Sequence, residues 1–332
     1  MDAPSFWYPD KPGTRPWQAR ALAPFGALYH RANALRFIGQ EGYTGKAPII
    51  CVGNLVAGGS GKTPTAIAIA QTLLSEGRQV HFLTRGYGGR ERGPVQVDIT
   101  RHNHTDVGDE ALLLAAFAPT WIAMNRVTGA HAAAQAGADV IIMDDGFQNH
   151  PSLTQACSLA VVDGERGFGN GQVIPAGPLR EPVSSGLKRA HGVILVREAE
   201  NPTPPEITAS GLPLFRARLT VKSQGFSLTN ERVIAFAGIG HPGKFFRTVR
   251  QTGAELVEAI PFADHAPYSP AIIERMAKQA EQTYAQLITT EKDMVRIPAD
   301  LRYLVRVVSV DMTFEDEPAV MALLKAQIET LK

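Results

Sequence analysis

Residues 52–64, with the sequence VGNLVAGGSGKTP, decide how the rest of the chain is organised. The apolar run at residues 49–52 leads into this stretch and predicts a buried strand. Residues 65–76 follow with apolar side chains at helical spacing, and Gly77 is a typical helix end. Glycines between a strand and a helix are typical of a phosphate-binding loop, because backbone N–H groups and the helix N-terminus favour an anion. The stretch therefore predicts a nucleotide site.

The side chains of this loop have separate expected roles in binding ATP and Mg²⁺. Lys62 is expected to reach the terminal phosphates, and the Thr63 hydroxyl is expected to bind Mg²⁺. The usual pattern has Gly where this chain has Val56, and one group of dimerising ATPases has Lys where it has Ala57. A glycine-rich turn with an incidental Lys is less favoured, because Gly-Lys-Thr occurs here with the strand and helix that phosphate binding requires. The predicted ATP-binding residues are Gly58, Gly59, Ser60, Gly61, Lys62 and Thr63.

The composition is that of an ordinary folded chain and excludes several function classes. The chain has 332 residues, enough for two domains, and a formal net charge of +1. This balanced charge argues against a nucleic-acid partner bound through a broad basic field. Its two cysteines, Cys51 and Cys157, do not form a disulfide framework and fit a reducing cytoplasm. No apolar run reaches the length of about 18 residues that a membrane span needs.

From residue 49 to residue 197 the sequence alternates between strand and helix signals. This alternation predicts a P-loop NTPase-like α/β fold, with a mainly parallel sheet and helices on both of its faces. Ligands bind such sheets outside the carboxyl ends of the strands, so polar residues that follow strands are the candidate site residues. The expected strands are residues 49–52, 80–83, 121–124, 140–143, 159–162 and 193–196.

Charged residues follow several of these strands. Asp144 and Asp145 end an apolar strand, where a carboxylate is expected to hold Mg²⁺. Two adjacent ionised carboxylates are energetically unfavourable there unless a cation or N–H groups balance their charge. A turn without a functional role is therefore the weaker interpretation. Arg85 lies in a glycine-rich loop after the second strand, and Arg180 lies in the long Gly/Pro loop 164–182. Long loops of that kind inside a compact domain are usually functional.

Asp109 and Glu110 fall in the first turn of an apolar helix. Helix capping and a favourable interaction with the helix dipole explain acids at this place without any catalytic function. From the residues alone, this structural explanation is a strong alternative to a role in chemistry.

The second half of the chain predicts a smaller α/β unit. Residues 214–221 and 304–310 are strand-like and are expected to pair as a two-stranded link into and out of it. Between them we expect strands at 233–237 and 287–290 and a helix that begins at Ser269-Pro270. The predicted division is an N-terminal segment 1–40, a P-loop domain 41–213 to which a last helix in 313–332 returns, and a C-terminal domain 214–312.

The N-terminal segment combines basic and aromatic residues. Residues 1–15 are expected to be extended, and residues 16–38 to form a helix with a kink at Pro24. No acid occurs between Lys11 and Gln40. This pattern is typical of a helix at an anionic membrane surface. A helix that packs its apolar side on the main domain is the alternative, and the sequence alone slightly favours it.

Taken together, the motifs resemble those of the tetraacyldisaccharide 4'-kinases of lipid A biosynthesis. This family also lacks the usual first Gly of the loop. The resemblance implies transfer of the ATP γ-phosphate to the 4'-hydroxyl of a lipid disaccharide 1-phosphate, by a peripheral enzyme at the cytoplasmic face of the bacterial inner membrane. It also makes residues 6–38 the expected contact with the lipid A precursor and with an anionic membrane surface. The matching motifs are residues 52–54, 58–64, 85–88, 108–110, 144–148, 178–181, 238–239, 264–265 and 290–293.

The resemblance also implies roles for single residues. By similarity to the family, Asp109 is the base that accepts the proton of the sugar hydroxyl, with His265 as its partner across a domain cleft. Lys62 belongs to the catalytic set, and Thr63 with Asp144 or Asp145 is expected to hold Mg²⁺. The expected substrate or phosphate contacts are Asn54, Arg85, Arg126, Gln148 and Arg180.

Two other function classes would explain the phosphate loop and the paired aspartates. One is a nucleotide-dependent switch or metallochaperone, and the other is a soluble small-molecule kinase. The switch leaves Gly108-Asp109-Glu110, Asp264-His265 and the basic N-terminal segment without an explanation. We expect a lipid substrate and no nucleic-acid or protein partner.

Overall fold

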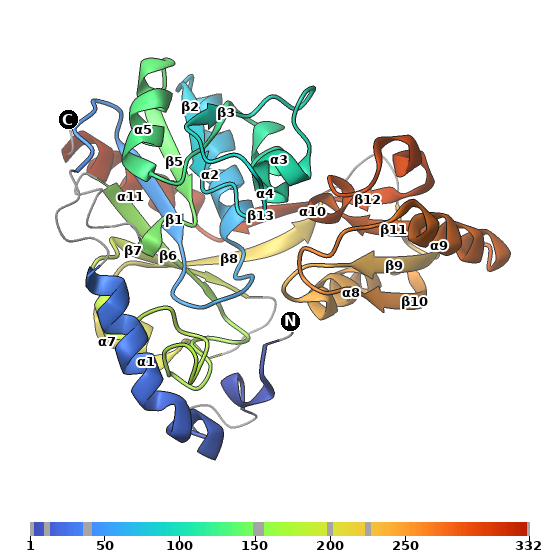
Figure 1. Ribbon diagram of the computed structural model, residues 1–332, viewed down its shortest axis with the longest axis horizontal. Helices are drawn as coiled ribbons and strands as arrows, with labels where there is room; N and C mark the ends of the chain where they lie inside the picture. The colour runs from blue at the N-terminus through green and yellow to red at the C-terminus, as the bar shows by residue number, and fades with distance from the viewer. Residues whose placement is uncertain are drawn as a thin grey trace.

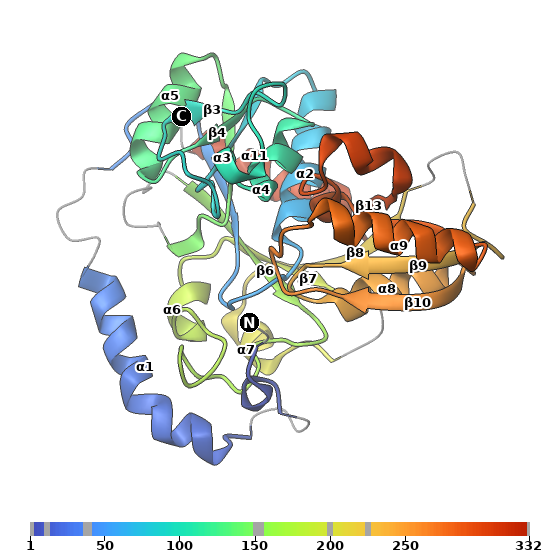
Figure 2. The ribbon, with the colours of Figure 1, turned by 45° about the vertical axis from the view of Figure 1, so that its right-hand side comes forward.

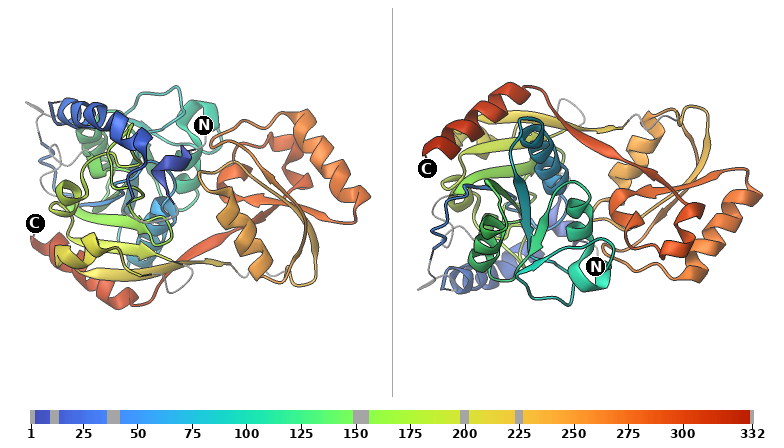
Figure 3. Two further views of the ribbon diagram at one scale, coloured as in Figure 1. Left: turned by 90° about the horizontal axis from the view of Figure 1, so that it is seen from below. Right: turned by 90° about the horizontal axis from the view of Figure 1, so that it is seen from above.

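The computed structural model describes residues 3–9, 14–35, 42–148, 156–197, 202–222 and 227–330. Two sheets organise these residues, and they lie side by side (Figures 1 and 3). The larger sheet and its helices are called the large unit below. Residues 227–308, which hold the smaller sheet, are called the small unit.

The large sheet is parallel from β8 to β4, and only its two edge strands run antiparallel to their neighbours. The predicted mainly parallel α/β sheet is therefore confirmed. The strand order is β13 (Val310–Phe314), β8 (Leu214–Val221), β7 (Gly192–Val196), β6 (Ala156–Asp163), β1 (Ile49–Gly53), β5 (Val140–Asp144), β2 (Val80–Thr84), β4 (Thr120–Ile122) and β3 (Val95–Gln96).

Helices cover both faces of this sheet because alternate strand residues point to opposite sides. Ile50 and Ile142 pack with Leu73 of α2 (Lys62–Ser75), on the face that α11 (Glu317–Thr330) also covers. The neighbouring residues Ile49 and Ile141 pack on the opposite face with α5 (Arg126–Gln135). Strand β1 is buried and without polar side chains at every position for this reason. The remaining helices of the unit are α3 (His104–Val107), α4 (Asp109–Ala115), α6 (Val183–Leu187) and α7 (Pro205–Ser210).

The small unit is a parallel sheet with a core on each face. Helix α8 (Pro242–Gln251) covers one face, while α9 (Pro270–Gln282) and the 3-10 helix η3 (Ala299–Leu304) cover the other. The short helix α10 (Glu291–Met294) follows the third strand along the chain. The strand order is β10 (Glu255–Pro261), β9 (Arg232–Ala237), β11 (Gln286–Thr290) and β12 (Arg306–Val308).

A two-stranded antiparallel ribbon, β8 with β13, links the two units (Figure 3). The predicted partner of residues 214–221 was residues 304–310, and this pairing is wrong. Leu304 ends η3, residues 306–308 belong to the small sheet, and Val310 is the first residue that pairs with β8. Strand β10 was also missed, because its edge position leaves Glu255 and Glu258 exposed and breaks the apolar pattern.

Helix α1 (Trp17–Leu35) lies along the large unit at the lower left of Figure 1 and contains Pro24. The predicted helix residues 36–38 lie outside the described residues. Its small residues face the protein: Ala19 is buried, and a Cβ added at Gly26 would lie 2.8 Å from the Val173 carbonyl oxygen. Trp17, Phe25, Leu28 and Tyr29 are exposed and Leu22 is half-buried, so the packing interpretation favoured from sequence alone does not describe this helix.

The segment before α1 contains a 3-10 turn, η1 (Ser5–Trp7), where an extended chain was expected. The Trp7 indole donates a hydrogen bond to the Pro175 carbonyl at 3.1 Å, and the Asn170 backbone N–H donates to the Trp7 carbonyl at 2.8 Å. These contacts tie the segment to the loop 164–182. None of the helices in the described ranges is long and apolar enough to cross a membrane.

Substitution of Leu73 tests the core beneath the phosphate loop. Leu73 is 1% exposed, whereas Leu74 of the same helix is only partly buried. Leu73→Ala is expected to lower the free energy of unfolding of the large unit by about 2–5 kcal/mol, because it leaves a cavity. Leu74→Ala is the matched control and should cost clearly less. Urea denaturation followed by circular dichroism measures both, and equal losses would contradict the assigned core.

Candidate active site

The candidate site lies at the carboxyl ends of β1 and β5, where the phosphate loop meets the paired aspartates. Gly61 is the N-cap of α2 and has a φ of 88°, a left-handed conformation that side chains rarely adopt. A Cβ added at Gly58 or Gly59 would meet no atom within 4 Å. The loop therefore leaves open space beside its backbone, as a phosphate cradle requires.

Asn54, the residue after β1, holds this loop in shape. Its side chain is fully buried and donates hydrogen bonds to Ser60 Oγ at 2.9 Å and to the Gly58 carbonyl at 3.3 Å. Lys62 Nζ donates to Asn54 Oδ1 at 3.3 Å. Gln148 donates to the Asn54 carbonyl at 2.9 Å. These contacts make Asn54 an organiser of the loop and place it beside the predicted phosphate-binding lysine.

Asp144 is a fully buried carboxylate that, in the part of the chain that the structure describes, has a hydrogen-bond donor on only one of its oxygens. Thr63 Oγ1 donates to its Oδ2 at 2.7 Å, while Oδ1 is buried and has no hydrogen-bond partner among the described residues. Burial and the nearby Glu110 carboxylate raise the pKa of Asp144 to about 7. A divalent cation beside Thr63 would relieve this cost, and the donor set fits Mg²⁺.

No group of three or more acidic, histidine or cysteine side chains that could hold a metal occurs within the described part of the chain. Mg²⁺ at nucleotide sites usually has one or two carboxylate ligands and takes others from the phosphates. Thr63 and Asp144 therefore fit a Mg²⁺ that is completed by bound ATP.

Asp145 differs from Asp144 because it is already paired with two cations. Its carboxylate lies 3.5 Å from Lys62 Nζ and accepts from Arg180 Nη1 at 2.9 Å. Burial alone would raise the pKa of Asp145, but the charges of Lys62 and Arg180 lower it to about 2. Arg180 also donates to Gln148 at 3.0 Å. The structure thus groups three predicted contacts, Lys62, Arg180 and Gln148, around Asp145.

Arg126 and Arg85 place further positive charge at this end of the sheet. Arg126 is 5% exposed, and its Nε has no partner among the described residues. Burial and the charge of nearby Arg85 lower the pKa of Arg126 to about 10. Its Nη1 donates to the Ala123 carbonyl. Two neighbouring guanidinium groups disfavour each other, so an anion between them would be stabilising.

Asp109 meets His265 across the boundary between the two units. Asp109 begins α4, is 4% exposed, and its Oδ2 lies 3.0 Å from His265 Nδ1. His265 follows β10 in a loop where its own φ is 58°. Burial alone would raise the pKa of Asp109, but the hydrogen bond from His265 and the nearby charges of Lys292 and Arg296 lower it. The carboxylate is therefore ionised and able to accept a proton.

Two further basic residues from α10 and the turn after it support this pair. Lys292 Nζ lies 3.2 Å from Glu110 Oε1 and 3.4 Å from His265 Nε2. Arg296 is 3% exposed, and its Nε lies 3.7 Å from Asp109 Oδ2. Sequence reasoning gave neither residue a role, although Lys292 stands in the 290–293 motif after a predicted strand. The signal that could have indicated a role for Lys292 was its position as a charged residue just after a strand.

The small unit also contacts the large unit at two further places: beside the phosphate loop, and through its own helix α8 (Figure 2). A Cβ added at Gly240 would lie only 3.0 Å from the Gly59 backbone nitrogen. On α8, Lys244 forms an ion pair of 2.7 Å with buried Asp163. Together with the Asp109–His265 contact, these interactions bring the loop at residues 238–241 directly over the phosphate loop.

A phosphate loop with paired aspartates at the neighbouring strand end, together with an ionised carboxylate at the boundary of the two units, is the arrangement of a P-loop phosphotransferase. The loop orients a phosphate donor, and the carboxylate suits an acceptor hydroxyl. Comparison with known proteins places the chain within this class.

The profile of the LpxK family, described as tetraacyldisaccharide-1-P 4'-kinase, matches residues 18–329. A tetraacyldisaccharide 4'-kinase of Paramagnetospirillum magneticum is 49% identical over 321 residues, 97% of each chain. One of Dinoroseobacter shibae is 48% identical over 333 residues, 98% of this chain and 97% of the other. The chain belongs to the tetraacyldisaccharide 4'-kinase family.

A solved structure agrees with this assignment. The "apo" form of LpxK from Aquifex aeolicus, crystallised in complex with ATP, superimposes with a TM-score of 0.72 and 25% sequence identity. The match covers 93% of this chain and 99% of the other. The fold is therefore that of a kinase family in which one member has been observed with ATP.

The Thr63 hydroxyl offers a direct test of the Mg²⁺ site. Thr63→Val keeps the shape of the side chain but removes the group that donates to Asp144, so we expect weaker binding of Mg²⁺-ATP by about tenfold. Binding of ATP without Mg²⁺ should change little. Thr72→Val on the same helix removes a hydroxyl that bonds Ala68 and Glu317, and it serves as the matched control. Titration calorimetry with and without Mg²⁺ measures both variants; equal effects of Mg²⁺ on Thr63→Val and wild type would refute the site.

Proposed function

We propose that this protein transfers the γ-phosphate of ATP to the 4'-hydroxyl of a tetraacyldisaccharide 1-phosphate in lipid A biosynthesis. Membership of the family supports the substrate class. The single observation that carries the chemistry is the 3.0 Å contact between Asp109 and His265, which supplies an ionised base near the phosphate loop. A nucleotide switch needs no such base.

The phosphate donor is held by the loop 58–63. Lys62 and the backbone N–H groups of the loop bind the β- and γ-phosphates, and Lys62 exchanges part of its interaction with Asp145 for the nucleotide. Thr63 and Asp144 would hold Mg²⁺, which would supply positive charge next to the phosphates. Phosphoryl transfer depends mainly on such positioning and charge neutralisation.

The acceptor hydroxyl is activated by Asp109. The carboxylate accepts the hydroxyl proton as the sugar oxygen attacks the γ-phosphorus, the bond between the γ-phosphorus and the bridging oxygen breaks, and ADP leaves. The hydrogen bond from His265 keeps the Asp109 carboxylate oriented. Arg85, Arg126 and Arg180 contribute positive charge for phosphate groups of ATP or of the lipid. Arg180 is positioned for this by its contacts with Asp145 and Gln148.

Helix α1 is the proposed contact with the anionic membrane surface and with the acyl chains, at the cytoplasmic face of the inner membrane. Trp17, Phe25 and Leu28 are 74%, 59% and 66% exposed, although exposure of large apolar side chains is unfavourable in water. Arg20 and Arg31 are also exposed on this helix. Apolar side chains together with arginines suit a helix that lies in an anionic membrane interface.

The transfer reaction itself tests this function. With ATP labelled in the γ-phosphate and a detergent-dispersed tetraacyldisaccharide 1-phosphate, the protein should yield a labelled lipid. Asp109→Asn should lower kcat by about 10²–10⁴-fold, because it removes the base but keeps the shape. ATP affinity should be nearly unchanged. Slow release of inorganic phosphate without a labelled lipid would instead select a switch, and loss of ATP binding alone in Asp109→Asn would refute its role as base.

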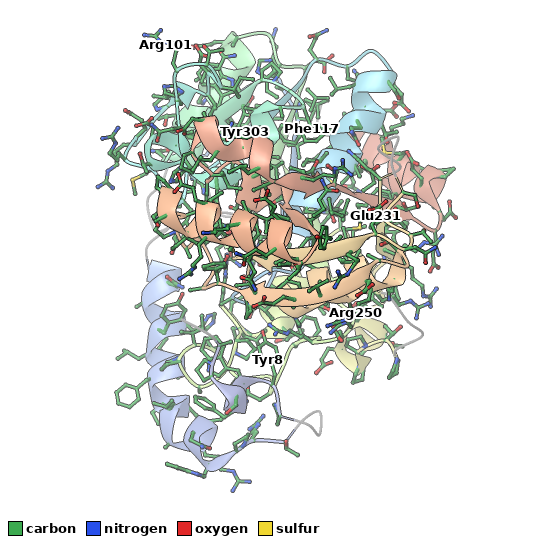
Figure 4. The ribbon with its side chains drawn as sticks, turned by 90° about the vertical axis from the view of Figure 1, so that its right-hand side faces the viewer. Tyr8, Arg101, Phe117, Glu231, Arg250 and Tyr303 are labelled. Atoms are coloured by element: carbon green, nitrogen blue, oxygen red, sulfur yellow. The ribbon has the colours of Figure 1, made fainter. Side chains whose placement is uncertain are left out.

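Vesicle binding tests the role of α1. Replacement of Trp17, Phe25 and Leu28 by Ser should reduce the binding constant for anionic vesicles, measured by co-sedimentation, by about 10⁴-fold, because about 2 kcal/mol is lost for each of the three large apolar side chains that no longer enter the interface. The control replaces Tyr284 and Tyr303, which are 89% and 82% exposed on the small unit (Tyr303 is labelled in Figure 4). Equal binding by both variants would contradict the assignment.

A further inference from the structure

Lys292 lies between two acidic groups and one histidine, which come from both units. Its Nζ lies 3.2 Å from Glu110 Oε1, 3.4 Å from His265 Nε2 and 3.7 Å from Asp264 Oδ1. Glu110 belongs to the large unit, whereas Lys292, Asp264 and His265 belong to the small unit. The lysine is therefore placed beside the ring nitrogen of His265 that does not face Asp109.

The contact determines which nitrogen of His265 carries hydrogen. A lysine ammonium group has three donors and no acceptor, so Nε2 of the ring must accept from it. A neutral imidazole then carries its hydrogen on Nδ1 and donates it to Asp109 Oδ2 at 3.0 Å. Lys292 and Asp109 thus select the same tautomer from opposite sides of the ring.

The other groups around His265 favour a different state. Asp109 and Glu110 of α4 and Asp264 of its own loop would together stabilise a positively charged imidazolium. Asp264 Oδ1 lies 3.7 Å from Nε2, so its negative charge would stabilise a positively charged ring. Two cations oppose this state: Lys292 next to Nε2, and Arg296 3.7 Å from Asp109. The Tyr87 ring, 5.4 Å away, adds no charge.

Lys292 keeps its own charge in this position. Burial alone would lower the pKa of Lys292, but the carboxylates of Glu110, Asp109 and Asp264 outweigh burial and raise it. The ammonium group is thus a permanent positive neighbour of His265.

We propose that Lys292 is a positioning residue that holds His265 in the tautomer with its hydrogen on Nδ1, so that the ring donates a hydrogen bond to Asp109. An imidazolium hydrogen-bonded to Asp109 would place a full positive charge against the carboxylate and weaken it as a base. A neutral donor orients the carboxylate without that charge. This inference rests on the proposed function, in which Asp109 accepts the hydroxyl proton.

The protonation of His265 can be observed without turnover. Nitrogen NMR of protein labelled in its histidines, with His265 assigned by the His265→Gln variant, distinguishes the two tautomers from the imidazolium. In wild type, His265 should show hydrogen on Nδ1 only, between about pH 6 and pH 8, because Nε2 accepts from the Lys292 ammonium group. In Lys292→Met, Nε2 should acquire hydrogen at the acidic end and lose it as pH rises. Lys292→Arg retains a donor cation and should resemble wild type.

Kinetics provide the second measurement and separate the inference from simple domain docking. Lys292→Met should lower kcat about 10- to 100-fold at pH 6 and less at pH 8, because His265 becomes neutral again as pH rises. Lys292→Arg should recover most of the rate. Lys244→Met removes a different ion pair between the units, with Asp163, and should not alter the pH profile.

Three results would overturn the proposal: an imidazolium or a hydrogen on Nε2 of His265 in wild type, an unchanged His265 spectrum in Lys292→Met, or the same pH profile in Lys244→Met as in Lys292→Met. Failure of the proposed function would appear differently. Wild-type protein would then transfer no phosphate to the lipid, while the NMR result would be unaffected.

Discussion

A single contact of 3.0 Å, between Asp109 Oδ2 and His265 Nδ1, depends on the correct docking of two separate units. Asp109 is nearly fully buried, and a buried carboxylate is unfavourable unless hydrogen bonds or charges compensate it. Its compensation comes from His265 and Arg296, both in the small unit. The β8–β13 ribbon and the Lys244–Asp163 pair hold that unit in place. The buried Asp109 carboxylate is therefore stabilised when the small unit is docked, which is also the conformation that brings His265 next to it.

The two aspartates after β5 illustrate how environment divides chemically identical groups between two tasks. Asp145 has cations on its carboxylate and a pKa of about 2, so it organises Lys62 and Arg180 before any ligand arrives. Asp144 has one hydroxyl donor, one unpartnered oxygen and a pKa of about 7. A bound cation would offset the cost of burying the charged form of Asp144, which fits the Mg²⁺ site proposed for Thr63 and Asp144.

The phosphate loop and the main sheet could be predicted from sequence because their signals are local, as in the strand, glycines and helix around Lys62. Strands β9 and β11 and helix α9 of the small unit could be predicted from the same local signals, but the exposed edge strand β10 could not. The Asp109–His265 contact joins residues separated by 156 positions, so no spacing rule indicates it, and only family resemblance linked them. The exposure of Trp17, Phe25 and Leu28 could not be predicted from sequence either, because an apolar stripe is compatible with burial in the protein and with membrane contact.

A double-mutant cycle on Asp109 and His265 tests most directly whether these two residues act as one unit across the domain boundary. The measured quantity is kcat/KM for phosphate transfer from ATP to the lipid in wild type, Asp109→Ala, His265→Ala and the double variant. Residues that act together are strongly non-additive. If the two residues act as one unit, we expect the double variant to be about as slow as Asp109→Ala alone. A double variant slowed by the full product of the two single effects would contradict it.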